Sequence, residues 1–433
     1  MDEPTAGLTC VVAFGSRVFA GDANGFVRCY AATSGLGGLV SGGGGGGGGG
    51  GESENGNESD SRETERGSSS TAAPADGSAE VPLSTPEWVA RAAQGAILSL
   101  CVIQDPRATS SRVTALKNAN ENDDENAAAR RSENLLLVVG TASGELVFFR
   151  NETEARRVQL ESAVLQICAH GSEAEFLAGD LRGTLYGVNQ YGVLWKERLG
   201  QESDVQDASA LSSQGDESNG GAFFYPPTVQ PMCKAIASIS VPDIENTLSS
   251  YVLLSTGQRH LIVTHQGKAF AYIPTSSPVS TVASFLPGAS KEQEDVILFA
   301  GEAGSKVYRI STSREPSFRY WSHLSVSFSI VKILHIGNAS SDGEDGANSK
   351  CDSFTWVCLG LNGQVALFCG KKLTREWNAT ISSLSSSSNS SSFPVDAAVI
   401  SSRSSTSANL AKKESKMVAI AFPDRVQLFA VGS

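Results

Sequence analysis

Two aspartates stand where a carboxylate could act as a general acid or base. Asp180 follows Ala178-Gly179 at the end of an apolar run, and Asp22 occupies the same place in another unit. A catalytic carboxylate has no reason to recur in this way, whereas Asp side chains commonly bond the amides of turns. The repetition therefore favours a structural role for both residues.

The five histidines form no catalytic constellation with a nucleophile. His260 and His265 are close enough in sequence to face one site, but the residues around them favour a surface or turn role. The sequence has no G-x-S-x-G elbow, no G-x-x-x-x-G-K-S/T loop and no H-E-x-x-H pair. We therefore expect no catalytic residues, no cofactor and no small-molecule substrate.

The eight cysteines predict neither a zinc site nor a disulfide framework. No two are spaced as C-x-x-C, and no histidine pair stands near them at the spacing of zinc ligands. Most lie in apolar runs, where a free thiol behaves as a small buried hydrophobe. We expect reduced core thiols and no metal. The cysteines are Cys10, Cys29, Cys101, Cys168, Cys233, Cys351, Cys358 and Cys369.

The net charge of −12 and the pI of about 5.0 disfavour nucleic acid as a partner. Phosphate binding needs clustered Lys and Arg, and no such stripe is present. The acidic start MDEPTAGLTC is unlike a signal peptide, and no apolar run is long enough to span a membrane. We expect a cytoplasmic protein without direct membrane insertion.

Six segments have compositions that cannot bury enough apolar area to offset chain entropy. They are rich in Gly, Ser, Asn and charged residues, and one contains the run Gly42–Gly51. Long surface insertions are compatible with a compact fold, because each doubling of loop length costs only about 0.6 kcal/mol. The predicted disordered insertions are 35–85, 105–133, 201–221, 338–352, 380–392 and 401–415.

Between these insertions one pattern recurs, in which a Gly-centred turn joins two apolar strands. The clearest copy is FLAGDLRGTLYGVNQYGVLWKERL, Phe176 to Leu199. From Gly144 to Gly183 is about 39 residues, near the roughly 40–45 of a four-stranded blade. The repeated turn glycines, needed for φ > 0, are Gly25, Gly144, Gly183, Gly267, Gly304 and Gly363.

Each hairpin follows a further apolar strand, and several precede a tryptophan. The preceding runs suit the innermost strand of a blade, packed on both faces. A Trp repeated in the outer strand indicates one packing site between adjacent blades, used several times. The innermost strands are expected near residues 8–14, 96–103, 163–169, 235–241, 279–286, 330–336 and 395–400. The repeated tryptophans are Trp88, Trp195, Trp321 and Trp377.

These patterns predict an all-β fold: one seven-bladed β-propeller over residues 1–433, with mostly four-stranded antiparallel blades. The last copy ends at Ala430, which leaves no room for a fourth strand after it. The N-terminus offers only a few residues before Leu8 to fill that place, and a last blade of three strands is the alternative. An open edge there would attract a partner strand.

The unit at Phe176 to Leu199 resembles the repeat of PQQ-type propellers. The stretches GDANGFVRCY, VVGTASGELVFF, LGLNGQVALF and AFPDRVQLFA are similar to the integrin-alpha FG-GAP-repeat protein family. That resemblance implies a seven-bladed subunit of a scaffold complex restraining target-of-rapamycin signalling at the lysosome. The calcium loop frequent in FG-GAP repeats is missing, since Asp22-Ala23-Asn24-Gly25 is only a fragment of it. The Gly-His and Trp-Asp signatures of WD-type propellers are also absent.

We therefore expect a non-catalytic scaffold that binds other proteins in a multi-subunit complex. The resemblance adds a cytoplasmic location, peripheral to the lysosome, and a nutrient-signalling role. A propeller subunit of a ciliary or vesicle trafficking complex is the first alternative. A PQQ-like quinoprotein enzyme is the second, but such an enzyme would be secreted and would need a calcium site.

Overall fold

The computed structural model describes the strands of the repeats and the short turns between them. The described residues are 7–32, 81–83, 85–104, 135–150, 152–170, 175–199, 232–242, 248–265, 267–275, 278–285, 295–301, 306–312, 319–338, 354–370, 372–379, 393–403 and 414–431. All regular elements among them are β-strands, apart from one residue in 3₁₀ conformation.

Within this part of the chain the strands form seven four-stranded antiparallel sheets, six of which are complete blades. Blade 1 contains β1 (Leu8–Phe14), β2 (Arg17–Asp22), β3 (Phe26–Ala31) and β5 (Trp88–Arg91). Blade 2 contains β6 (Ile97–Gln104), β7 (Leu135–Thr141), β8 (Glu145–Arg150) and β9 (Thr153–Gln159). Blade 3 contains β10 (Val164–Ala169), β11 (Phe176–Asp180), β12 (Thr184–Asn189) and β13 (Gly192–Arg198).

The chain continues around the ring in the same order. Blade 4 contains β14 (Ala235–Pro242), β15 (Leu248–Ser255), β16 (His260–His265) and β17 (Lys268–Pro274). Blade 5 contains β18 (Val279–Phe285), β19 (Asp295–Gly301), β20 (Lys306–Thr312) and β21 (Arg319–Ser325). Blade 6 contains β22 (Ile330–Asn338), β23 (Phe354–Gly360), β24 (Gln364–Cys369) and β25 (Lys372–Asn378).

The seventh sheet, which we call the closing sheet, is built differently. Three of its strands are β26 (Asp396–Arg403), β27 (Glu414–Ala421) and β28 (Val426–Val431). The fourth strand is β4 (Val81–Pro82), only two residues long, which comes from the connection between β3 and β5 of blade 1. The sequence predicts seven blades, and the structure has six complete blades plus this sheet with a shortened outer strand.

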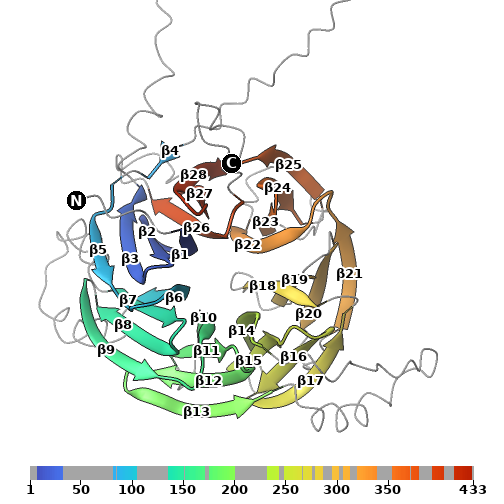
Figure 1. Ribbon diagram of the computed structural model, residues 1–433. Helices are drawn as coiled ribbons and strands as arrows, with labels where there is room; N and C mark the ends of the chain where they lie inside the picture. Colours follow the sequence, from blue (N-terminus) through green and yellow to red (C-terminus); the bar gives the residue numbers. More distant parts are fainter. Residues whose placement is uncertain are drawn as a thin grey trace, which may run out of the picture.

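The sheets are arranged as the blades of a propeller around a central axis (Figure 1). The innermost strands β1, β6, β10, β14, β18, β22 and β26 contact one another in this order, and β26 contacts β1. Their places match the innermost strands expected from the sequence. An all-β propeller with four-stranded antiparallel blades is thus confirmed.

The hydrophobic core consists of seven layers, each between two adjacent sheets. Leu177 and Leu185 of blade 3, for example, pack with Val252 and Ile262 of blade 4. Further layers join blades 1 and 2, 2 and 3, 4 and 5, 5 and 6, blade 6 and the closing sheet, and the closing sheet and blade 1. Because each sheet packs on both faces, middle strands such as β7 and β11 are buried along their whole length.

The ends of three predicted insertions need correction. Residues 81–82 of the insertion 35–85 form β4, and the fourth position of the last sheet is filled by them rather than by residues before Leu8. Asn338 belongs to β22, and residues 401–403 and 414–415 belong to β26 and β27. The rest of 338–352 and 401–415, and all of 105–133, 201–221 and 380–392, lie outside the described residues.

Candidate functional site: the turn face and its grooves

Short turns between the second and third strands lie on the same face of the ring as the links between blades. We call this the turn face. In blade 1 the carbonyl of Gly25 accepts the N–H of Ala92, the first residue of the link to blade 2, at 2.8 Å. The same bond joins Gly144 to Leu160, Gly183 to Leu199 and Gly363 to Ala379. In these four blades the turn glycine therefore holds the first residue of the link to the next sheet.

Gly25 shows why the position requires glycine. Its φ is +87°, a region that other residues rarely adopt, and a Cβ there would lie 2.2 Å from the carbonyl oxygen of Ala93. The turn could not approach the link closely with a side chain in that place. The glycine signal in the sequence thus has two physical causes, a backbone angle and a close contact.

Gly267 does not occupy the equivalent place. It lies between β16 and β17, the third and fourth strands of blade 4, whereas Gly257 with φ +80° lies between the second and third. The sequence assignment of Gly267 as the turn glycine of this repeat was therefore wrong by one hairpin. Gly304 lies outside the described residues.

Asp22 and Asp180 bond the amides of their own turns, as their repetition predicts. One oxygen of Asp180 accepts the N–H of Arg182 at 2.9 Å and that of Thr184 at 2.7 Å, and the other accepts the hydroxyl of Tyr186. Asp22 accepts the equivalent amides of residues 24 and 26. Both carboxylates are fully buried. Burial and the neighbouring Asp180 raise the pKa of Tyr186 to about 12.

Three of the predicted tryptophans lie in layers between adjacent sheets. Trp88 in β5 lies between Phe19 of its own blade and Phe149 of blade 2, with ring centroids 6.1 and 6.5 Å away. Trp377 in β25 packs in the layer between blade 6 and the closing sheet. These contacts are of the kind expected for an indole between blades.

Trp195 in β13 is held between two glycines. A Cβ on Gly187, its partner in β12, would lie 2.2 Å from Cε2 of the indole, and one on Gly267 of blade 4 would lie 3.1 Å from Cε3. Gly267 therefore lies directly against the indole of Trp195. It gives the indole of the preceding blade room to pack.

The pairing between the third and outer strands is irregular at one recurring place. This irregularity gives Trp321 and Trp195 different register positions. In blades 2 to 6 the pairing shifts after the fourth residue of the third strand. Trp321 lies at this bulge, the register position of Leu194 and Phe270. Trp195 comes one residue later, opposite the fourth residue. The four tryptophans thus do not share one register position.

The histidines and cysteines are placed as follows. His260 is buried beside the ring of Tyr272, contrary to the surface or turn role expected for it. Burial lowers the pKa of His260 to about 4, and burial with nearby Lys416 does the same for His335. The described cysteines are all free, and Cys351 lies outside the described residues. Burial raises the pKa values of the Cys10, Cys29 and Cys101 thiols to about 12.

Polar side chains connect neighbouring sheets, and several of them line a central cavity of about 560 Å³ formed by the innermost strands. Each of the seven junctions has at least one such contact among the described residues. The contacts are Thr9 to Ile97 O, Ser99 to Val164 O, His170 to Ser238, Ser255 to Val279 O, Thr281 to the Ile333 amide, Lys332 to Asp396, and Asp396 to the Val11 amide.

Asp396 has the largest share in this ring of contacts. Its Oδ1 lies 2.9 Å from Nζ of Lys332 in blade 6, and its Oδ2 accepts the N–H of Val11 in blade 1 at 3.0 Å. The carboxylate raises the pKa of Lys332. One side chain of the closing sheet therefore connects it to both neighbours.

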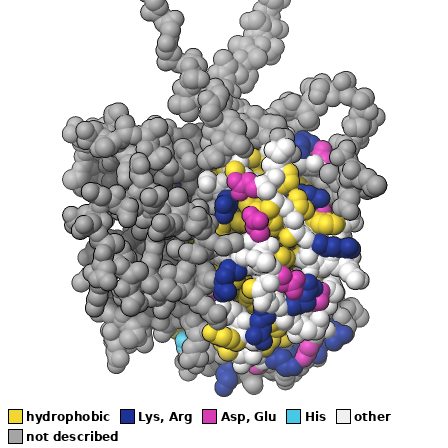
Figure 2. Space-filling view, turned by 90° about the vertical axis from the view of Figure 1, so that its left-hand side faces the viewer, with side chains coloured by type: hydrophobic (Ala, Val, Ile, Leu, Met, Phe, Trp, Pro, Cys, Tyr) yellow, Lys and Arg dark blue, Asp and Glu magenta, His cyan; other side chains and the backbone are white. Residues whose placement is uncertain are grey.

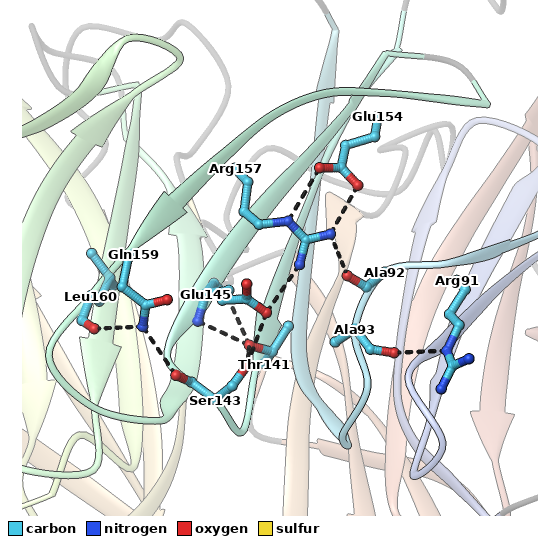
Figure 3. Close-up of polar contacts among 10 residues, drawn as sticks. All are labelled: Arg91, Ala92, Ala93, Thr141, Ser143, Glu145, Glu154, Arg157, Gln159 and Leu160. Atoms are coloured by element: carbon cyan, nitrogen blue, oxygen red, sulfur yellow. Dashed lines mark hydrogen bonds and ion pairs between the residues drawn. The ribbon is translucent and has the colours of Figure 1, made fainter.

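A second cavity, of about 510 Å³, opens between blades 1 and 2 on the turn face. We call it the junction groove. It is lined by Arg91, Ala92, Ala93, Gln94, Gly95, Ser143, Glu145 and Arg157. Figure 3 shows polar contacts of this region, in which Ala92 and Ala93 of the link lie on one side and residues of the β7–β8 turn and β9 lie on the other.

Arg157 is saturated by its neighbours in this groove. Its guanidinium contacts Glu154 at 2.9 Å and Glu145 at 3.0 Å and donates to the carbonyl of Ala92 at 2.9 Å (Figure 3). The hydrogen bond that Arg157 donates to Glu154, and then the one that it donates to Glu145, raises the pKa of Arg157. This residue fixes the wall of the groove and has little capacity left for a ligand.

Arg91 is the arginine of the groove whose terminal nitrogens could bind a ligand. Its Nε donates to the carbonyl of Ala93 at 3.2 Å, and its guanidinium lies 5.6 Å from the ring of Phe26. Among the described residues, none accepts from its two terminal nitrogens, and the side chain is exposed. A planar guanidinium held in this way presents two parallel donors, the geometry that suits a carboxylate.

The rim on this side of the ring has no patch of one charge. Figure 2 shows Lys and Arg interspersed with Asp and Glu over the described surface, with apolar side chains between them. Recognition there would depend on single placed groups such as Arg91 rather than on a continuous basic surface.

Sequence reasoning missed both Arg91 and the pair Lys332 and Asp396. A usable signal was present for the pair, because a lysine and an aspartate each interrupt an apolar innermost strand, IVKILHI and VDAAVI. Arg91 directly precedes a link at the end of an outer strand, but many surface arginines do so. Only the bond to Ala93 and the groove distinguish it.

No family model matches the chain, and no curated protein matches it. Solved structures do share its fold. The WD40 β-propeller domain of Doa1 has a TM-score of 0.51 at 8% identity, covering 100% of this chain and 95% of that chain. The β-propeller domain of Myceliophteria thermophila Cps50 (Swd1) has a TM-score of 0.53 at 10% identity, covering 99% of each chain.

These likenesses establish the β-propeller fold and no more. They arise without the Gly-His and Trp-Asp signatures of WD-type repeats. Among the described residues, no cluster of three or more His, Cys, Asp or Glu side chains is arranged to hold a metal ion. The same part of the chain has no helix with the length and apolar character needed to cross a bilayer.

Proposed function

We propose that this protein is a non-catalytic scaffold, a subunit of a multi-subunit complex that binds partner proteins on its turn face. The observation that carries this proposal is the junction groove, where Arg91 presents two donors beside a cavity of about 510 Å³. We infer that an Asp or Glu side chain, or a C-terminal carboxylate, of a partner protein docks there.

The internal chemistry of the described residues supports a non-catalytic role. The repeated aspartates are used on turn amides, and the thiols with raised pKa values are protonated at neutral pH. The likeness to WD40 propeller domains supports the scaffold role at the level of the fold. Neither neighbour tells which partners this chain binds.

Purification of the tagged full-length protein from its own cells tests the proposal. We expect recovery in a complex of defined stoichiometry. The amount of one partner recovered with the variant Arg91→Glu should be at least about tenfold lower than with the wild type. Arg156→Glu is the matched control, because Arg156 is an exposed arginine of β9 outside the groove lining. Recovery of the wild-type protein as a lone monomer would contradict the proposal.

We further propose a peripheral position at the lysosome in target-of-rapamycin signalling. Its support is the resemblance of the stretches around Gly25, Gly144 and Gly363 and of the C-terminal hairpin to the FG-GAP-repeat protein family. Fluorescence microscopy of the tagged chain together with a lysosomal marker, in fed and starved cells, tests this location. Accumulation at cilia or transport vesicles would instead favour a trafficking complex.

A further inference from the structure

The outer edge of the closing sheet is only partly covered. All six residues of β28 pair with β27, but β4 pairs only with Gln427 and Leu428. Leu83 adds one bond to the carbonyl of Val426. The outer strands of blades 2 to 6 have seven residues each, so β4 fills less than a third of the usual length.

The direction of the backbone groups follows from that bond. In an antiparallel pair, alternate residues point their N–H and C=O groups to the same side. Since the carbonyl of Val426 points outward to Leu83, those of Leu428 and Ala430 point outward too. Ala430 is exposed, and among the described residues no strand pairs with it on that side.

This edge also lacks the usual protection against strand addition. Edge strands are commonly guarded by charged side chains or proline. The outer strands β9, β13 and β25 each carry three or more charged residues, whereas β28 reads VQLFAV and has none. Pro82 in β4 is a residue of the kind that prevents strand addition, but it lies opposite Gln427 and does not cover Ala430.

A buried acceptor beside β4 is unsatisfied. The side chain of Gln427 is 4% exposed, and its Oε1 has no hydrogen-bond partner among the described residues. The two residues of β4 are Val and Pro, whose side chains have no donor. An outer strand with Ser, Thr, Asn or Lys at this level could supply one.

We propose that an extended segment of a partner protein displaces β4 and becomes the full outer strand of the closing sheet. It pairs antiparallel with β28 through the outward groups of Val426, Leu428 and Ala430. This inference rests on the proposed scaffold role and names a second mode of contact, strand addition, on a surface separate from Arg91.

The test uses the purified full-length chain and a fluorescein-labelled peptide of sequence KLTREWN. This peptide copies β25, the outer strand that pairs with β24 in blade 6. We expect saturable binding by fluorescence anisotropy. Ala430→Pro should weaken it at least about tenfold, because proline removes an outward N–H without breaking a bond to β27. Ala430→Ser is the matched control and should bind within about twofold of the wild type.

A second variant tests displacement. Pro82 and Gln427 lie directly opposite in a pair without mutual backbone bonds, where Cα atoms are about 4.5 Å apart and a disulfide fits. In the variant Pro82→Cys, Gln427→Cys, oxidation should abolish peptide binding and reduction should restore it. Arg91→Glu should bind the peptide normally, so failure of strand addition is distinguishable from failure of the groove.

Three results would overturn the proposal. The first is equal peptide binding by Ala430→Pro and Ala430→Ser. The second is binding that survives the closed disulfide. The third is no saturable binding to the reduced wild-type chain, together with strong protection of the Ala430 amide from hydrogen exchange in the free protein. That last result would show that the chain's own residues already occupy the edge.

Discussion

At the scale of single residues, the repeat depends on positions where the backbone of a turn forms a hydrogen bond with the backbone of the following link. The carbonyl of a turn glycine and the N–H of the following link approach to 2.7–3.2 Å in four blades. The turn aspartates add a second connection within their own hairpins. At Gly25 and Gly144 a Cβ would lie 2.2 and 2.8 Å from a carbonyl oxygen of the link, so these two glycines leave no room for a side chain.

Gly25→Ala should destabilise the protein by at least about 2 kcal/mol. The alanine would keep a φ of +87° at a strain cost, and its Cβ would collide with the carbonyl oxygen of Ala93 at 2.2 Å. Gly95→Ala is the matched control in the link itself, because a Cβ there has nothing within 4 Å and no strained φ. Urea unfolding followed by tryptophan fluorescence measures both, and equal midpoints would contradict this account.

Stability should fall as the pH drops from about 6.5 to 4, in part through His260. Its pKa in the folded protein is lowered to about 4 by burial, so between these values the unfolded chain binds a proton that the folded chain does not. The stabilisation is complete above pH 6.5 and is lost as the pH falls through 4. One group of this kind accounts for about 1–3 kcal/mol.

The measurement compares the unfolding free energy at pH 7.5 and 4.5 in two variants. His260→Gln should have a smaller loss on acidification than the wild type. His335→Gln, which removes the other buried histidine whose pKa is lowered to about 4, should reduce the loss in the same direction. An identical pH dependence in all three proteins would show that His260 does not contribute.

At the residue scale, the structural role of a repeated residue type could be predicted from the sequence, whereas the burial of a single residue and its neighbours in space could not. Gly25 and Asp180 could be recognised because their motifs recur. Burial of His260 could not, because a histidine at the start of a strand is compatible with either environment and the choice depends on Tyr272, twelve residues further along. The groove around Arg91 is also a tertiary property, formed when a link and a turn of different blades meet.

At the scale of elements, strand positions follow from the sequence, whereas registers do not. Apolar runs and Gly turns located every innermost strand. The bulge after the fourth residue of the third strand has no clear composition signal, and it decides which outer-strand residue faces the next blade. Trp195 and Trp321 therefore read alike in sequence but differ by one residue in register. Gly267 was misassigned for a similar reason, since two hairpins of blade 4 both contain Gly.

Asp396→Ala should destabilise the protein by about 2–4 kcal/mol, because it leaves the ammonium of Lys332 and the amide of Val11 without their acceptor. Lys332→Met alone should cost less, since Asp396 keeps its backbone donors. In a double-mutant cycle, the combined variant Lys332→Met, Asp396→Ala should be less destabilised than the sum of the two. Additive losses would mean that the pair does not hold the closing sheet to blade 6.

At the scale of the whole molecule, the core is distributed among the junctions between sheets. The layers on either side of the closing sheet include Leu428 toward blade 1 and Phe429 toward blade 6. The short β4 adds a contact from blade 1 to the outside of that sheet. The sequence predicts a ring of repeats, but neither the way in which the ring closes nor the origin of the last strand was predictable. Two residues inside a Gly- and Ser-rich region give no strand signal.

A ring of this kind should tolerate moving its chain ends but not losing a sheet. The first variant is a circular permutant in which Val431 is joined to Gly7 and new ends are opened within 105–134, between β6 and β7. A Gly/Ser linker of about 15 residues has a typical span of about 20 Å, comparable to the length of a strand. The permutant keeps all seven layers, so we expect a monomer that melts cooperatively, within about 5 °C of the wild type.

The second variant ends at residue 392 and lacks the closing sheet. It exposes the apolar faces of blades 1 and 6 that now pack against Ile400, Val418 and Leu428. Because large exposed apolar surfaces associate, we expect aggregation or a soluble oligomer in size-exclusion chromatography. A truncated monomer with an unchanged melting temperature would show that the six complete blades are stable without closure. A permutant that fails to fold would show that the native order of the chain, and not the ring alone, is required.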